Sequence, residues 1–267
     1  MAMEWKIDEK TRTLVIRGKG AMADYKDNQQ SKQPWLFKET NIPRSEKDLT
    51  IRHIKIGSGI TAIGECTFEK LKDVETVELP NSIKTIGVHA FSECTALKSI
   101  VIPGGVESIK DYAFENCTGL TSVELSEGLK SIGNNVFSGC TALESVKMPT
   151  GVTSIGDGAF WGCSALKTIR VPSGVKSIGN QTFYGCAALD SVKIPSTVTV
   201  IDRSAFSGCS SMTSLKLPNN LKSIGACAFW GCSELEISMS NKEIDIGKDA
   251  FRSVKSVKIR TDDWNKL

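Results

Sequence analysis

The sequence contains nine cysteines, the residue type with the largest number of possible chemical roles here. A cysteine can form a disulfide, bind a metal or act as a nucleophile. Seven of them recur every 23 residues, at Cys94, Cys117, Cys140, Cys163, Cys186, Cys209 and Cys232. Seven residues cannot pair off completely, and the Cys-x-x-Cys spacing typical of metal sites is absent. Leu71 and Val254 occupy the same repeated position, so we expect a ladder of buried thiols that act as small apolar side chains.

Cys66 and Cys227 lie at a different repeated position, which His89 occupies one repeat after Cys66. Cys66 and His89 are therefore expected to be neighbours. A zinc site needs four protein ligands, or three and a water, so we interpret this pair as a chance proximity. His53 falls on a strand face away from His89, and no Cys–His dyad, serine triad or converging carboxylate pair is predicted. The sequence thus predicts no catalytic residue, no metal site and no cofactor.

The seven cysteines belong to a repeat that a phenylalanine marks, at Phe68, Phe91, Phe114, Phe137, Phe160, Phe183, Phe206 and Phe229. A fixed period of this length is typical of solenoids. In one unit, Ile169 and Val171 alternate with the outward Thr168 and Arg170, which predicts a short strand. Pro172 then ends the strand, because proline lacks the N–H group that a sheet requires.

The rest of each unit contains a second apolar pair, closed by glycine, and then the sequence Ala-Phe-x-Gly-Cys. The closing residue is glycine at Gly64, Gly87, Gly133, Gly156, Gly179 and Gly225, and departs from glycine at Lys110 and Asp202. We expect this position to need either a positive φ or a close approach of two backbones. Ala-Phe-x-Gly-Cys is expected to form a turn of 3₁₀ or α helix. Units this short bury their apolar face only by stacking, which places the phenylalanines in a column.

The N-terminal segment differs from the repeat. Residues 5–8 and 13–16 flank a polar turn, which predicts a β-hairpin. A solenoid needs an end that covers its first rung, so Trp5, Trp35 and Phe37 are expected in the core of a cap.

The C-terminal end also departs from the pattern. The step from Phe229 to Phe251 is one residue short, residues 257–259 predict a last strand, and Trp264 is expected to cover that strand. The sequence thus predicts an N-terminal cap, a repeat array and a C-terminal cap, at residues 1–50, 51–250 and 251–267.

Composition excludes several classes of protein. The formal charge of the 267 residues is +3 with no basic tract, which disfavours nucleic acid as a partner. No apolar run is long enough to span a membrane. The start of the chain at Met1 lacks the basic and apolar regions of a signal peptide, so we expect either a cytosolic chain or one whose leader has been removed.

One outward column of the main strand changes sign along the repeats. It reads Glu78, Val101 and Glu124, followed by four cations, Lys147, Arg170, Lys193 and Lys216. Four cations one rung apart predict a basic stripe, whose repulsion Glu144 and Asp190 are expected to relieve in part. A solvated face is the ordinary interpretation of such a run, and a binding strip for an acidic partner is the functional one.

A second outward column is nearly all hydroxyl, at Thr76, Ser99, Ser122, Ser145, Thr168, Ser191 and Ser214. We interpret it as small residues that suit a strand, ahead of a polar floor for a ligand. A third position, directly after the phenylalanine, is aromatic at Trp161, Tyr184 and Trp230. These rings either stack on sugars or anchor a protein, or else lie flat over the turn beneath them.

The order Leu-x-x-Ile/Val-x-Ile/Leu-Pro, then Ile-Gly, then Ala-Phe-x-Gly-Cys resembles the BspA-like leucine-rich repeat of the Treponema pallidum type over residues 51–250. Gly18-x-Gly20-Ala21-Met22 and Pro34-Trp35 also resemble the opening of Bacteroides-type surface proteins. The resemblance implies an α/β-type repeat solenoid that is right-handed and mostly β, with a parallel sheet on its concave face. It also implies a secreted or cell-surface bacterial protein, often a lipoprotein.

The resemblance further implies adhesion, by binding host matrix proteins or bacterial surface proteins, and supplies no catalytic residues. We therefore expect a monomeric, non-enzymatic scaffold that engages a protein through its concave strand face. The candidate contact residues are Lys147, Arg170, Lys193, Lys216, Trp161 and Tyr184. The alternatives are a carbohydrate-binding module that uses Trp161 and Tyr184, or a structural spacer. An enzyme is not expected, because a regular array offers no convergent pocket.

Overall fold

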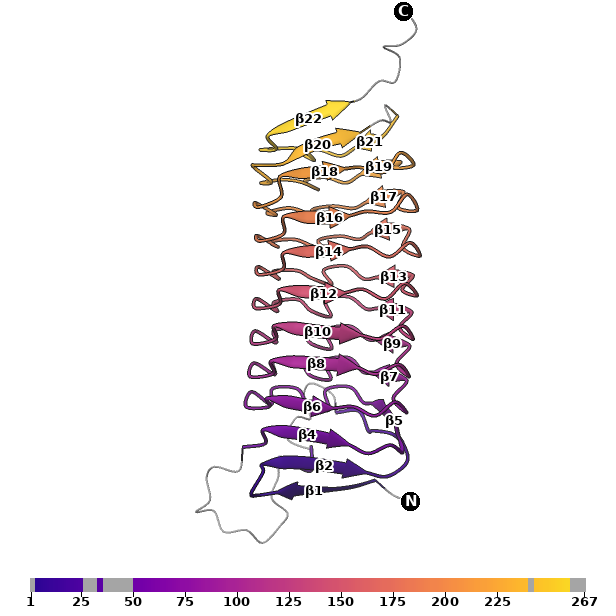
Figure 1. Ribbon diagram of the computed structural model, residues 1–267, viewed down its shortest axis with the longest axis vertical. Coiled ribbons are helices and arrows are strands. Elements are labelled where there is room, and N and C mark those ends of the chain that lie inside the picture. Colours follow the sequence, from indigo (N-terminus) through magenta and orange to yellow (C-terminus); the bar gives the residue numbers. More distant parts are fainter. Residues whose placement is uncertain (1–2, 26–32, 36–49, 240–242, 260–267) are drawn as a thin grey trace, which may run out of the picture.

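The computed structural model of the chain describes residues 3–25, 33–35, 50–239 and 243–259. These residues form a β-solenoid in which one repeat makes one rung and successive rungs stack along the long axis (Figure 1). The strands of successive rungs pair in parallel and in register, and the solenoid predicted from the 23-residue period is confirmed.

One side of the solenoid, which we call the main-strand face, carries the first strand of each rung. Its strands are β4 (His53–Ile56), β6 (Thr76–Glu78), β8 (Ser99–Ile102), β10 (Ser122–Leu125), β12 (Ser145–Lys147), β14 (Thr168–Arg170), β16 (Ser191–Lys193), β18 (Ser214–Lys216), β20 (Glu236–Met239) and β22 (Ser256–Ile259). They belong to three sheets, with interruptions between β6 and β8 and between β16 and β18. Apolar side chains point into the core and polar ones outward, because successive strand residues face opposite sides.

A second face carries a shorter strand from each rung. These strands are β3 (Gly20–Ala21), β5 (Ile60–Ile63), β7 (Thr85–Ile86), β9 (Ser108–Ile109), β11 (Ser131–Ile132), β13 (Ser154–Ile155), β15 (Ser177–Ile178), β17 (Val200–Ile201), β19 (Ser223–Ile224) and β21 (Asp245–Ile246). They form two parallel sheets, with an interruption between β13 and β15.

The third side of each rung is a series of turns, and none of the described residues is helical. The prediction of a helical turn at Ala-Phe-x-Gly-Cys is therefore wrong. Residues two before and two after each phenylalanine have positive φ, such as His89 (φ 50) and Glu93 (φ 58) around Phe91, and they interrupt a right-handed helix. Alternate N–H groups bond to the next rung instead, as Phe91 does to the carbonyl of Ala113 at 2.8 Å.

Glycine serves two different purposes in the rung. The glycines that close the second strand lack positive φ and sit where backbones approach closely: a Cβ on Gly156 would lie 2.5 Å from the backbone N of Asn134. The glycine of Phe-x-Gly does have positive φ, as at Gly185 (φ 69), where a Cβ would meet its nearest neighbour only at 3.8 Å.

Gly185→Ala is therefore expected to lower the free energy of unfolding by about 1–2 kcal/mol through backbone strain alone. Gly185→Asn is the matched control, because Asn116 adopts φ 55 at the same repeat position and asparagine tolerates this conformation. Urea titration of both variants tests this. An equal loss in the two variants would show that crowding, not backbone strain, governs the position.

The core is an unbroken column of aromatic rings. The eight predicted phenylalanines and Phe251 are stacked, with centroids 5.2–5.8 Å apart. Trp35 extends the column at the N-terminal end, with its ring 5.5 Å from that of Phe68. The rung is thus held by contacts to the rungs before and after it, which is why a single repeat does not fold alone.

The seven repeated cysteines form the buried ladder that the sequence predicts, and all nine cysteines are free. Each of the seven thiols donates to the carbonyl oxygen of the phenylalanine in the preceding rung. Sγ of Cys117 lies 3.1 Å from the oxygen of Phe91, and the other distances are 3.1–3.2 Å. The thiol therefore satisfies a buried carbonyl group as well as filling space.

The N-terminal hairpin consists of β1 (Glu4–Asp8) and β2 (Thr13–Arg17), which pair antiparallel. Strand β2 continues in parallel with β4, so the hairpin joins the first rung directly (Figure 1). Trp5 is partly buried against the core and Trp35 is buried. Phe37 and Trp264, which we expected in the two caps, lie outside the described residues.

Candidate binding surface

Four exposed cations occupy one column of the main-strand face. Lys147, Arg170, Lys193 and Lys216 are the last residues of β12, β14, β16 and β18. They point outward because the residue before each of them fills the core or its edge. Arg170 and Lys193 are paired in register, and strands in such sheets lie about 4.8 Å apart. The predicted stripe is therefore one continuous surface feature, which we call the basic column.

A groove of about 710 Å³ runs along this column. Cations, aliphatic side chains and prolines line it, among them Lys147, Arg170, Lys193, Met148, Ile194, Pro172 and Pro195. Ser145 and Thr168, from the predicted hydroxyl column, also line it. One carboxylate, that of Glu127, also lines the groove and accepts hydrogen bonds from the backbone N–H and the hydroxyl of Thr150, at 3.1 Å each. The groove thus presents three cations and one carboxylate next to apolar surface.

A second hollow of about 360 Å³ continues the groove to Lys216 and shares Ile194 with it. It lies where β16 and β18 belong to different sheets. Neither hollow has an aromatic residue in its lining.

The charges of the basic column are not neutralised within the protein. Among residues 3–25, 33–35, 50–239 and 243–259, no carboxylate lies within 4.0 Å of any of its four cations. By contrast Lys55, nearer the N-terminus in the same column, is 2.9 Å from Glu78. The four cations are therefore available to an acidic partner.

The acidic neighbours Glu144 and Asp190 form no ion pair with the basic column in the part of the chain that the structure describes. Glu144 lies 2.8 Å from Lys167, and this hydrogen bond lowers the pKa of Glu144 and raises that of Lys167. In the part of the chain that the structure describes, Asp190 has no ion pair within 4.0 Å. Glu144 is thus engaged outside the basic column.

The aromatic residues lie on the turns, at another site. The rings of Trp161 and Tyr184 are nearly parallel, at 5°, with centroids 5.9 Å apart. One face of each ring therefore lies against the other ring. Trp161 is still 41% exposed and Trp230 is 45% exposed.

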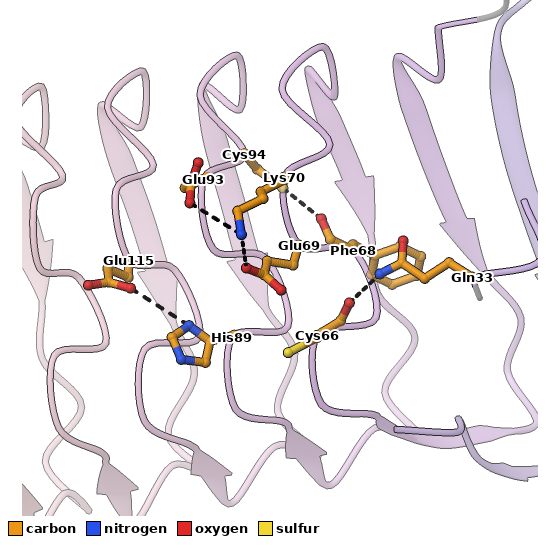
Figure 2. A network of polar contacts seen from close by, with 9 residues as sticks. All are labelled: Gln33, Cys66, Phe68, Glu69, Lys70, His89, Glu93, Cys94 and Glu115. Atoms are coloured by element: carbon orange, nitrogen blue, oxygen red, sulfur yellow. Dashed lines mark hydrogen bonds and ion pairs between the residues drawn. The ribbon is translucent and has the colours of Figure 1, made fainter. Parts of the chain in front are cut away.

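The described ranges contain no group of three or more His, Cys, Asp or Glu residues that could hold a metal. The ring of His89 stacks on Tyr112 at 4.7 Å, and Nδ1 of His89 lies 3.7 Å from Oε2 of Glu115 (Figure 2). Burial raises the pKa of Glu115, and His89 opposes that shift.

Sequence reasoning missed the charged residues around His89. Lys70 lies 2.8 Å from the buried carboxylate of Glu69 and 3.8 Å from Glu93 in the next rung (Figure 2). Lys70 and Glu93 are 23 residues apart, so opposite charges one period apart are the signal that could have revealed this contact.

A ladder of side chains on the turns was also missed. Asp111, Asn134, Asp157 and Asn180 occupy one repeat position, and each of the first three accepts a hydrogen bond from the backbone N–H of the next, at 2.8–2.9 Å. The 23-residue period could have revealed this ladder, because only Asp and Asn occupy this position in four successive units. The ladder thus ties successive rungs together.

The chain matches the family model described as the BspA type leucine rich repeat region, in six copies over residues 46–167 and 130–258. Its structure is similar to that of a leucine-rich-repeat protein of T. pallidum, with 27% identity and a TM-score of 0.60, over 79% of this chain and 87% of that one. The comparison with curated proteins gives no match.

Two further solved structures have lower TM-scores. One is a leucine-rich cell surface protein of Faecalibacterium prausnitzii, with 20% identity and a TM-score of 0.43, over 97% of this chain and 93% of that one. The other is a leucine-rich-repeat protein of Bacteroides ovatus, with 22% identity and a TM-score of 0.35, over 94% of this chain and 90% of that one. Within the described residues, no helix is long and apolar enough to cross a membrane.

Proposed function

Because the chain belongs to the BspA-type leucine-rich-repeat family, we propose that it is a non-enzymatic scaffold that binds a protein partner through its main-strand face. One observation carries the proposal: four exposed cations, which form no ion pair with any described residue, line a groove and its continuation on that face. The proposal includes a secreted or cell-surface location and a role in adhesion, both of which the family implies.

The chemistry of the reactive side chains supports a binding role. The ladder thiols are buried, and burial raises the pKa of Cys117 and Cys186 to about 12, so these thiols stay protonated at neutral pH. A protonated, inaccessible thiol is a poor nucleophile. His89 faces Glu115 and Tyr112, not a thiol. The main-strand face therefore exposes positively charged side chains, which favour binding to an acidic surface.

We expect the purified chain to retain a specific partner from host matrix proteins or bacterial surface extracts at low salt and to release it as salt rises. Reversing all four cations of the basic column to Glu is expected to weaken this binding roughly 10- to 100-fold, since each exposed pair contributes about 0.2–1 kcal/mol. Surface plasmon resonance at two salt concentrations measures the change.

The matched control reverses four exposed cations elsewhere, Lys110, Lys130, Lys176 and Lys222, three of which precede strands of the second face. Both variants have the same net charge, so a non-specific effect of charge appears equally in both. Equal weakening in the two variants, or full binding by the basic-column variant, would contradict the proposal.

A carbohydrate-binding module is the second candidate, and the exposure of Trp161 favours it. Sugars stack on open aromatic faces, and Trp161 shares one face with Tyr184. Glycan-array signal that disappears in Trp161→Ala and persists in the basic-column variant would favour this candidate over the first.

A further inference from the structure

We propose that the basic column receives an acidic α-helix of its protein partner, which lies along the long axis of the solenoid with one carboxylate per helical turn. The inference rests on the proposed function, because it assumes that the main-strand face binds a partner. It adds the shape, the charge pattern and the direction of the segment that binds.

Spacing is the first argument. The four cations span three rung intervals, which amount to about 14–15 Å at the separation of paired strands. Three turns of an α-helix rise about 16 Å, so carboxylates one turn apart follow the cations to within about 2 Å. Same-face residues of an extended peptide are about 6.7 Å apart, and four of them would span about 20 Å. Flexible lysine side chains accommodate the small mismatch in length with a helix more readily than the larger mismatch with an extended peptide.

The main-strand sheets are interrupted between β16 and β18, the strands that end at Lys193 and Lys216. The ring column in the core continues through this region, with centroid distances of 5.5 Å for Phe160–Phe183 and 5.2 Å for Phe183–Phe206, which match those elsewhere in the column. The rungs therefore stack without a gap in the core, and the spacing of paired strands applies directly to Arg170 and Lys193.

The lining of the groove is the second argument. Met148 and Ile194 offer apolar contact beside the cations. This suits an amphipathic helix, in which apolar residues three and four positions apart flank a row of carboxylates. Because neither hollow is lined by an aromatic ring, a sugar chain would find no ring to stack on there.

The sign change along the column gives the direction. Glu124 is paired in register with Lys147, at the end of the basic column that faces the N-terminal rungs. A helix carries partial positive charge at its N-terminus and partial negative charge at its C-terminus. The bound helix therefore places its N-terminus next to Glu124 and its C-terminus next to Lys216.

Synthetic peptides test this directly. A fluorescent, stapled helix with glutamates at i, i+4, i+7 and i+11 is compared with a stapled helix of the same composition whose glutamates are spread around the axis, and with a proline-interrupted peptide that cannot form a helix. We expect the aligned helix to bind the full chain about tenfold more tightly than either comparison peptide, a difference of about 1.4 kcal/mol. Arg170→Glu should remove most of this preference, and Lys176→Glu should leave it unchanged.

The outcomes separate this inference from the proposed function. If the aligned helix and the proline-interrupted peptide bind equally, and both lose binding in Arg170→Glu, the proposal that the bound segment is a helix would be overturned. The proposal of an acidic partner would stand. Competition by a sulfated polysaccharide, with no preference among the peptides, would likewise overturn the helix. Failure of every anion to bind would overturn both. A spin label on the peptide N-terminus that broadens signals near Lys216 instead of Glu124 would overturn the direction.

Discussion

Phe160→Ala is expected to lower the free energy of unfolding by about 3–5 kcal/mol, the range for removing a fully buried aromatic side chain. The ring of Phe160 lies 5.5 Å from the rings of both Phe137 and Phe183, so the substitution removes one ring and two stacking contacts. The backbone carbonyl oxygen of Phe160 also accepts a hydrogen bond from the thiol of Cys186. A cavity at this place weakens the contacts on which both neighbouring rungs depend.

The loss is expected to spread along the array, because each rung is stabilised mainly by its neighbours. Hydrogen exchange should show faster exchange in the rungs on both sides of residue 160 than in distant rungs. Trp161→Ala is the matched control, since this adjacent side chain is 41% exposed and should cost less than about 1 kcal/mol. A loss below about 1 kcal/mol for Phe160→Ala in a urea titration would contradict the role given to the ring column.

The period of 23 residues made most of this structure predictable from the sequence. Once Phe68 and its successors are placed on one column, the position of every other repeated residue follows, and Cys117 or Lys193 falls on a buried or an exposed column by counting. Alternation along the strands then separates the outward Arg170 from the inward Ile169. The ring column, the thiol ladder and the basic column all depend on this single regularity.

Features that depend on backbone conformation could not be predicted in the same way. The positions of positive φ are occupied by residues as different as His89, Tyr112 and Gln181, so composition gives no signal there. We expected a turn of 3₁₀ or α helix at Ala-Phe-x-Gly-Cys. The neighbouring rung decides the conformation, since it supplies the carbonyl groups that the turn N–H groups reach.

The groove is also not visible in the sequence. The sequence predicts the four cations, but the hollows beside them depend on how the side chains and loops of several rungs pack together. The pairing of Glu144 with Lys167 depends similarly on side-chain reach across one rung. Trp35 lies outside the repeat, so its stacking on Phe68 has no periodic signal.

Stability is expected to fall steeply as pH rises above about 8.5, because most thiols of the ladder hold their protons in the folded state. Cys232 is the exception, since its interaction with Cys209 lowers the pKa of Cys232. Burial raises the pKa of Cys117 and Cys186 to about 12, and those of Cys94, Cys140 and Cys163 are also raised. In the unfolded chain a thiol ionises near pH 8.5. The stabilisation is therefore complete below about pH 8.5 and is lost as pH rises towards about 12.

The slope follows from proton binding. Between these two values the folded state binds one more proton per thiol than the unfolded state, which lowers the free energy of unfolding by about 1.4 kcal/mol per pH unit for each thiol. Cys117 and Cys186 together account for about 3 kcal/mol per pH unit. Since domains are stable by only about 5–15 kcal/mol, these two thiols and the rest of the ladder should unfold the protein within one to three units of alkaline pH.

Replacing Cys117 and Cys186 by valine tests the argument, because Val254 occupies the same repeat position naturally. Urea titrations of both proteins at several pH values between 7 and 10 measure the slope, and any pH-independent packing cost of valine cancels in that comparison. The double variant should lose about 3 kcal/mol per pH unit less than the wild type above pH 9. Cys227→Ala, which removes a half-buried thiol outside the ladder, is the control for the loss of a cysteine as such. Identical slopes in the double variant and the wild type would show that the ladder thiols ionise without unfolding, and that water reaches the column next to the phenylalanine rings.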